Sequence, residues 1–194
     1  MAVSTRDRIL DAAMELFGQH GYKGTSIVAI ETAAGLTPGA GGIYHHFPTK
    51  AALLEAGIQR HLDRLDALRD IRRILTGLGD LPAELTVLGR YALAELDHEA
   101  DLLRIVLGEA RSNPALVATA VEALVAATYT TFAGWLQERA DLDPQRAEAV
   151  AAVGLGALFS ARLLRLLLGR DPIAVDDDLF IDIWVRMIQS QILS

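Results

Sequence analysis

Residues 24–50 read GTSIVAIETAAGLTPGAGGIYHHFPTK, and this stretch decides the fold of the amino-terminal part of the chain. Thr25 or Ser26 can cap a first short helix, because Ser and Thr side chains accept hydrogen bonds from exposed N–H groups at helix starts. Its apolar residues recur at spacings of three and four. Gly35 then ends this helix, since glycine enters the left-handed conformation without a steric cost.

A second helix is predicted almost immediately afterwards. Thr37 is a cap, and Pro38 has a backbone pre-set for the first helical position. So short a connection makes the two helices cross, which is the helix-turn-helix arrangement. In DNA-binding proteins of that shape the second helix enters the major groove.

The flanking residues supply a small apolar core. Upstream, a stripe from Ile9 to Phe17 predicts an amphipathic helix that Ser4 and Asp7 open and Gly21 closes. Downstream, Phe47 is expected to fill the core. Pro48 and Thr49 cap a further helix that begins at Lys50, whose position at a helix start suits a phosphate contact.

In these features the first fifty or so residues resemble the DNA-binding domain of TetR-family transcriptional regulators. The resemblance implies an all-α homodimer with an N-terminal three-helix helix-turn-helix domain, here residues 1–50. It also implies a larger C-terminal helical domain, residues 51–194, that binds a small molecule and forms the dimer. The residues that carry the resemblance are the Ile9 to Phe17 stripe, Gly21, Thr25, Ser26, Ile30, Ala34, Gly35, Leu36, Tyr44, His45, His46, Phe47, Pro48, Thr49 and Lys50.

Two features depart from the family pattern. Two extra residues stand within Pro38–Gly42, and a loosened first helical turn is expected to absorb them. Each glycine there costs about 1 kcal/mol relative to alanine in a helix interior, so the second helix is expected to be poorly formed without DNA. Glu31 stands where the family commonly has alanine, and its side chain is expected to face solvent.

The second helix offers few groups for reading bases directly. Between Leu36 and Phe47 there is no Arg, Lys, Asn or Gln, the side chains best suited to bidentate contacts with guanine or adenine. Specificity is therefore expected to rest on phosphate contacts, DNA shape and half-site spacing, with Ala40 able to contact a thymine methyl. The candidate DNA-binding residues are Thr25, Ser26, Thr37, Pro38, Gly39, Ala40, Gly41, Tyr44, His45 and Lys50.

The charge of the chain is unevenly distributed. Residues 1–50 hold four basic and four acidic residues, whereas the remainder holds 14 basic and 21 acidic residues, which accounts for the formal net charge of −7. A neutral DNA-binding domain on an acidic body cannot rely on bulk attraction to DNA. Weak and strongly salt-dependent nonspecific binding is therefore expected.

Beyond Lys50 the sequence predicts helices throughout, at about 50–76, 83–97, 99–112, 115–140, 144–168 and 176–192, with breaks at glycine and proline positions. The last two helices have apolar faces too broad for ordinary surface helices. Two such hairpins could form an intermolecular four-helix bundle, or the faces could pack within one chain. The candidate dimer residues are Leu155, Phe159, Leu163, Leu166, Phe180, Ile183, Trp184, Met187 and Ile188.

An effector site is implied among the helices from about 50 to 140, and a largely apolar effector is favoured. Most polar residues there have ordinary alternatives: Tyr129 and Trp135 as core residues with satisfied polar tips, and Glu109 with Arg111 as a surface ion pair. The candidate ligand-binding residues are Tyr91, Glu95, His98, Arg104, Glu109, Tyr129 and Trp135.

Other chemistry is disfavoured. The chain has no cysteine, which excludes disulfides and thiolate metal sites. The adjacent His45 and His46 point about 100° apart on a helix and cannot chelate one metal from one face. No cofactor, metal or enzymatic activity is expected. No signal peptide is expected, and the apolar run around Ala149 to Ala161 is shorter than a membrane span requires, so a cytoplasmic location is expected.

Three functions remain open. The first is a repressor that binds a palindromic DNA operator as a homodimer and is released by a small, largely apolar effector. The second is an effector-independent regulator, or an activator, with the same DNA-binding domain. The third is a helical binding or enzyme-like protein in which the amino-terminal motif is only structural.

Overall fold

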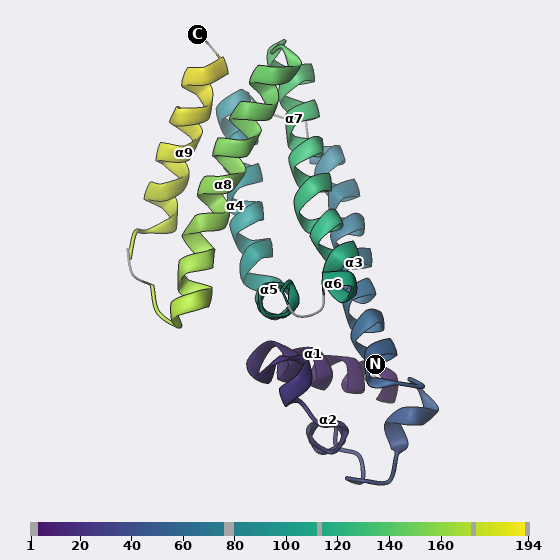
Figure 1. The fold of residues 1–194 in the computed structure, drawn as a ribbon. Coiled ribbons are helices and arrows are strands. Elements are labelled where there is room, and N and C mark those ends of the chain that lie inside the picture. Colours follow the sequence, from purple (N-terminus) through teal and green to yellow (C-terminus); the bar gives the residue numbers. More distant parts are fainter. Residues whose placement is uncertain (1–3, 76–79, 112–113, 172–173, 193–194) are drawn as a thin grey trace. The chain divides into compact units, whose positions relative to one another are not determined.

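The computed structural model describes residues 4–75, 80–111, 114–171 and 174–192, and nearly all of them are helical (Figure 1). The predicted all-α class is confirmed, and the helices from Lys50 onward begin and end within a few residues of their predicted limits. Parts of three predicted breaks, at positions 77–79, 113 and 172, lie outside the described residues. The helices are α1 Thr5–Gly24, α2 Ile27–Ala33, α3 Lys50–Leu75, α4 Leu81–His98, α5 Ala100–Glu109, α6 Pro114–Val121, α7 Ala127–Ala140, α8 Pro144–Leu168 and α9 Asp177–Ile192.

Local signals account for these limits. The Ser4 hydroxyl accepts a hydrogen bond from the Asp7 N–H at 3.1 Å and caps α1, as predicted. Gly21, with φ 73° and ψ 164°, interrupts α1 near its end. Asp143 caps α8 through the Arg146 N–H at 3.0 Å. The predicted helix at 115–140 contains one irregularity, a π-helical turn at Glu122–Ala126.

The contacts divide the chain into two compact units. Unit 1 contains residues 1–67 and 99–122, and unit 2 contains residues 68–98 and 123–194. In unit 1, α1 packs along α5 and against α2. Its buried side chains include Ile9, Leu10, Phe17, Ile30, Ile43, Phe47, Leu53, Leu54, Leu102 and Ile105.

Unit 2 is built from α4, α7, α8 and α9 around Trp184. The Trp184 indole N–H donates a hydrogen bond to the Gly154 carbonyl at 2.8 Å. The two helices can approach this closely because Gly154 has no side chain: a Cβ there would lie 2.7 Å from Ile188 Cδ1. Other members of this core are Leu85, Leu93, Phe132, Leu136, Val150, Leu158, Ile181 and Val185.

The α8 helix is long and apolar enough to pass as a membrane span by length and composition, contrary to the sequence-based expectation that its apolar run is too short. In unit 2 it packs against α4, α7 and α9, and Val150, Ala151 and Leu158 are buried in the core. Apolar core helices of helical bundles pass the same test.

Candidate nucleic-acid interface

Residues 37–47, here called the reading segment, follow α2 and precede α3. The predicted second helix is wrong over its first half, because only Gly42–His45 form a short 3-10 helix, labelled η1. Gly39 and Gly41 have φ values of 76° and 73°, and a right-handed helix cannot contain such residues. The extra residues are therefore accommodated in an irregular turn, which agrees with the expectation of a loosened start.

Two buried side chains fix which residues of the segment face outward. Ile43 is fully buried and Phe47 is 3% exposed. The N–H of Phe47 donates to the Ile43 carbonyl at 2.9 Å, which keeps the two anchors one helical turn apart. Tyr44, between them, is 54% exposed, and His45 is also exposed.

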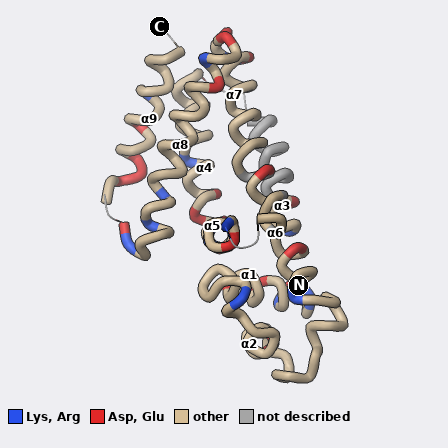
Figure 2. Tube along the Cα trace, viewed as in Figure 1, with Lys and Arg blue, Asp and Glu red and all other residues tan. Residues whose placement is uncertain are grey.

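The turn before η1 is also presented to solvent. Thr37, Pro38, Gly39 and Ala40 are all exposed, and Gly41 is half-buried. Figure 2 shows that this connection between α2 and α3 carries no Lys, Arg, Asp or Glu. The segment therefore presents backbone groups, small side chains, a phenol and imidazoles.

Thr25 and Ser26 have different roles from each other. Ser26 is exposed and caps α2 by accepting a hydrogen bond from the Ala29 N–H at 3.1 Å. Thr25 is 3% exposed, and its hydroxyl lies 3.0 Å from the Leu16 carbonyl and 2.9 Å from the Gly21 carbonyl. The expectation of a DNA contact by Thr25 needs correction, because its hydroxyl is used inside unit 1.

Lys50 is turned inward, which corrects its assignment as a phosphate contact. Its ammonium group donates to the Tyr22 carbonyl and lies 4.4 Å from the centre of the Tyr22 ring. Partial burial lowers the pKa of Lys50, while the negative charge of Glu109 acts in the opposite direction. The side chain thus holds the start of α3 against the end of α1.

Glu109 belongs to the same cluster. It is 6% exposed, and its carboxylate accepts a hydrogen bond from the Tyr22 N–H at 3.2 Å. The Tyr22 N–H is thereby bonded to Glu109 on α5, and the Tyr22 carbonyl to Lys50 on α3. The alternative of a surface ion pair between Glu109 and Arg111 is wrong, because Glu109 is buried and hydrogen-bonded to α1.

Glu31 departs most from expectation. Its side chain is fully buried, and Oε2 accepts a hydrogen bond from the Gly39 N–H at 2.7 Å. The prediction that it faces solvent is wrong. The sequence gives no sign of this contact, because the donor is a backbone amide in an irregular turn.

Two arginines that the sequence analysis did not select lie beside the reading segment. The Arg6 guanidinium lies 5.1 Å from the centre of the Phe47 ring, at the end of the segment. Arg8 lies beside Gly35, where a Cβ would be 3.4 Å from its Nη1. Both residues are exposed and could meet phosphates on either side of the segment. Their positions in the first turn of α1 were the available signal.

The candidate ligand residues do not gather in one unit. Arg104 and Glu109 belong to unit 1, and the other five belong to unit 2. His98 and Arg104 are exposed, and Arg104 forms an ion pair with Asp101 at 2.7 Å. The assignments of Arg104 and Glu109 therefore need correction, because each has a structural partner. Tyr91, Glu95, Tyr129 and Trp135 are half-buried.

Trp135 differs from its predicted description. Its ring stacks on Phe132 with centroids 5.7 Å apart and an interplanar angle of 9°. The indole nitrogen is buried and has no hydrogen-bond partner among the described residues, so the expected satisfied polar tip is wrong. A buried N–H without an acceptor is uncommon in proteins, and a bound molecule could provide one.

The candidate dimer residues divide into two groups. Trp184 and Ile188 are 2% and 1% exposed and belong to the core of unit 2, so their assignment to a dimer surface is wrong. Ile183 is 57% exposed. The remaining candidates, Leu155, Phe159, Leu163, Leu166, Phe180 and Met187, are half-buried. Exposed apolar residues that the prediction omitted are Val153, Leu167, Leu168 and Leu179.

Comparison with known proteins agrees with this geometry. Residues 9–56 match the model of bacterial regulatory proteins of the tetR family. The HTH-type transcriptional regulator UidR of Escherichia coli K12 is 33% identical over 123 residues, covering 60% of this chain and 57% of that protein. The HTH-type transcriptional repressor ComR of the same organism is 42% identical over 65 residues, covering 34% of this chain and 30% of ComR. The matched part thus spans 57% of the length of UidR and 30% of the length of ComR, less than two thirds of either relative.

Solved structures extend the likeness in fold to the whole chain. A TetR-like transcriptional regulator from Rhodococcus sp. RHA1 superposes with a TM-score of 0.74 at 18% identity, covering 100% of this chain and 98% of that one. A transcriptional regulator from Pseudomonas aeruginosa PAO1 gives the same TM-score at 20% identity, covering 97% and 90%. The amino-terminal segment, residues 9–56, thus matches the tetR family of bacterial regulatory proteins, and the fold of the whole chain is similar to that of a TetR-like transcriptional regulator.

Proposed function

We propose that this protein is a transcriptional regulator that binds a two-fold symmetric DNA operator as a homodimer, in the cytoplasm. The observation that carries the proposal is the orientation of the reading segment. Because Ile43 and Phe47 are buried, Tyr44 and His45 are held outward. An exposed tyrosine held by a rigid core suits a phosphate or base-edge contact.

Recognition would rely on shape and backbone contacts more than on base-edge hydrogen bonds. Tyr44, His45 and Thr37 are the polar groups presented, and Arg6 and Arg8 would add phosphate contacts beside them. None of the side chains of the reading segment forms a bidentate pair with guanine or adenine. Single base-pair changes are therefore expected to cost little, and half-site spacing to matter more.

Dimerisation would use α8 and α9. Val153 and Leu167 on α8, and Leu179 and Ile183 on α9, are 54–60% exposed. Val153 and Leu167 lie fourteen residues apart, close to four helical turns, and so share one face of the helix. Burial of such side chains against a second copy would stabilise a dimer by the hydrophobic effect.

Regulation would be repression that a small, largely apolar effector relieves. The support is the buried Trp135 indole N–H, which has no partner among the described residues and could donate to an effector. An effector can shift the equilibrium only if it prefers the conformation that does not fit the operator. An effector-independent regulator or an activator would share the DNA-binding domain and would not respond to such molecules.

Selection of duplexes from a randomised library tests the proposal. We expect a palindromic sequence to be enriched by the wild-type protein and released by at least one apolar small molecule. Tyr44→Ala should weaken binding to the enriched duplex by about tenfold or more, without lowering the melting temperature, because the side chain is exposed. Tyr44→Phe separates the hydroxyl from the ring. Unchanged binding by Tyr44→Ala, or no enriched duplex, would contradict the assignment.

A further inference from the structure

Glu31 is a buried carboxylate that the proposed function does not yet use. It lies in α2, next to the fully buried Ile30, and none of its side chain is exposed. A carboxylate in such surroundings is costly unless hydrogen bonds compensate the loss of water. The described residues supply one such bond, from the Gly39 N–H to Oε2 at 2.7 Å, and leave Oε1 without a partner.

The residue that donates this bond is in the middle of the exposed turn. Gly35, Gly39 and Gly41 all have φ values between 70° and 76°, and glycine populates many backbone conformations. A Cβ placed at Gly39 would have no atom within 4 Å, so no packing holds this point. The backbone hydrogen bond within this turn, from the Ala40 N–H to the Thr37 carbonyl, is long at 3.3 Å.

The two ends of the reading segment are held in different ways. The end at η1 is anchored by Ile43 and Phe47 in the core of unit 1. At the other end, the Glu31 carbonyl accepts a hydrogen bond from the Leu36 N–H at 2.8 Å, and the carboxylate accepts the one from Gly39. A single residue of α2 thus holds the turn at two points three residues apart.

We propose that Glu31 is a positioning residue for DNA recognition: its carboxylate fixes the glycine turn and so determines where Thr37, Pro38 and Ala40 meet the DNA. This inference rests on the proposed DNA-binding function. Because the presented residues lack bidentate base contacts, discrimination depends on how closely the backbone and small side chains fit the groove. A turn free to adopt other conformations would keep its phosphate contacts and lose that fit.

A pair of substitutions isolates the hydrogen bond from the charge. Glu31→Ala and Glu31→Gln both remove one negative charge near DNA, so any electrostatic gain in nonspecific binding is the same in both. Glutamine keeps an oxygen that can accept from the Gly39 N–H, whereas alanine does not. The quantity to compare is the ratio of the Kd for nonspecific duplex to the Kd for the duplex that wild type enriches from a randomised library.

We expect Glu31→Gln to retain this ratio within about twofold and Glu31→Ala to lower it about tenfold, mainly through weaker binding of the enriched duplex. If the wild-type protein selects DNA but the two variants give equal ratios, the inference is overturned and the proposed function is left intact. A wild-type protein that enriches no duplex would overturn both.

Amide hydrogen exchange measured by NMR without DNA gives a second readout. Exchange at the Gly39 amide should be slow in wild type and in Glu31→Gln, and fast in Glu31→Ala. The amides of α1 should exchange at the same rate in all three proteins. If Glu31→Ala fails to fold, fast Gly39 exchange in the wild type would still overturn the inference, and slow exchange that Glu31→Gln retains would support it.

Discussion

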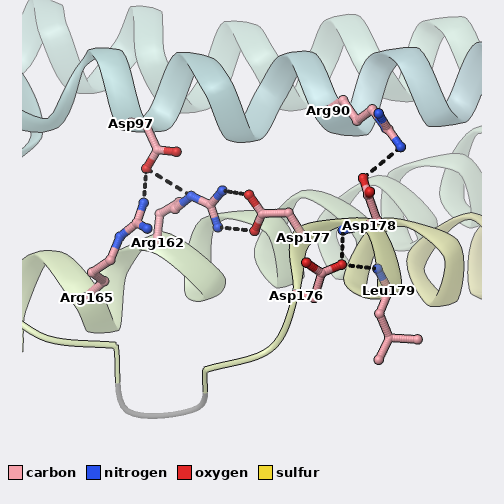
Figure 3. Close-up of polar contacts among 8 residues, drawn as sticks. All are labelled: Arg90, Asp97, Arg162, Arg165, Asp176, Asp177, Asp178 and Leu179. Atoms are coloured by element: carbon pink, nitrogen blue, oxygen red, sulfur yellow. Dashed lines mark hydrogen bonds and ion pairs between the residues drawn. The ribbon is translucent and has the colours of Figure 1, made fainter.

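Replacing Asp177 with asparagine should destabilise unit 2 by removing one partner of a buried arginine. Arg162, on α8, is 8% exposed and donates to both Asp177 carboxylate oxygens, at 2.9 and 2.6 Å (Figure 3). Its Nε lies 2.9 Å from an oxygen of Asp97 on α4, which also pairs with Arg165. The guanidinium group therefore joins α8 to the start of α9 and the end of α4.

The magnitude follows from the burial of the two partners. Removing one member of a fully buried ion pair costs about 3–5 kcal/mol, and exposed pairs contribute about 0–1 kcal/mol. The Asp177 side chain is 57% exposed and Arg162 keeps Asp97, so the cost lies between these limits, at about 1–2 kcal/mol. In a chain of this size that lowers the melting temperature by about 2–8 °C.

The contribution also depends on pH with a definite sign. The hydrogen bond from Arg162 holds the pKa of Asp177 below its usual value of 3.8. A carboxyl group whose folded pKa is lowered contributes stability above its unfolded pKa, and this stability is lost as the pH falls through the folded value. The difference in melting temperature between wild type and Asp177→Asn should therefore be constant near neutral pH and shrink below about pH 4.

Asp178→Asn is the matched control. The neighbouring Asp178 side chain is 74% exposed, and its ion pair with the 60% exposed Arg90, at 2.7 Å, belongs to the same helix start. It should lose at most about 1 kcal/mol. Thermal melts of the three proteins at neutral pH and down to about pH 3 make the comparison. Equal melting temperatures for Asp177→Asn and Asp178→Asn would refute the argument from burial.

Three further predictions test the dimer surface, the phosphate contact of Arg8 and the inward position of Lys50. Ile183→Glu, on the exposed face of α9, should convert the dimer into monomers in sedimentation experiments. The control Val87→Glu, at a similarly exposed position on α4, should leave the dimer intact. A dimer that survives Ile183→Glu would argue for another interface. Arg8→Ala should reduce the slope of log K against log salt for DNA binding by about 1.8 in a bound dimer, through the loss of one phosphate contact in each protomer. Lys50→Met should leave that slope unchanged and lower the melting temperature, because Lys50 donates to the Tyr22 carbonyl inside unit 1. A reduced slope for Lys50→Met would show that Lys50 contacts DNA after all.

The helices were predictable because their signals are local. Ser4 and Asp143 cap α1 and α8 as their residue types suggest, and Gly21 interrupts α1 where the sequence places a break. A cap and the amide it binds lie three residues apart, so a short window contains the whole interaction. The outward Tyr44 and inward Phe47 were predictable for the same reason.

Partners of charged side chains were not predictable because they lie far along the chain. Glu109 accepts a hydrogen bond from Tyr22, 87 residues earlier, and Lys50 bonds to the same residue from 28 positions later. From the sequence, both look like solvent-exposed charges near helix ends. Only the packing of α1 against α5 places them inside unit 1.

The division of α9 between core and surface shows a related limit. Trp184 and Ile188 face the core, whereas Leu179 and Ile183 face outward, and all four are apolar. Hydrophobic periodicity indicates that a helix is buried on more than one side. It does not indicate which side meets its own chain and which is left for a partner.

The two departures from the family pattern are a single feature in the structure. A glycine-rich turn without regular hydrogen bonds leaves an N–H group at Gly39 that needs an acceptor, and a buried carboxylate at Glu31 needs a donor. Each departure alone would be destabilising, and together they satisfy each other. Taken separately in the sequence, Glu31 suggested a solvated charge and the glycines a weak helix. The contact between them supports a defined turn at the point where the protein is proposed to meet DNA.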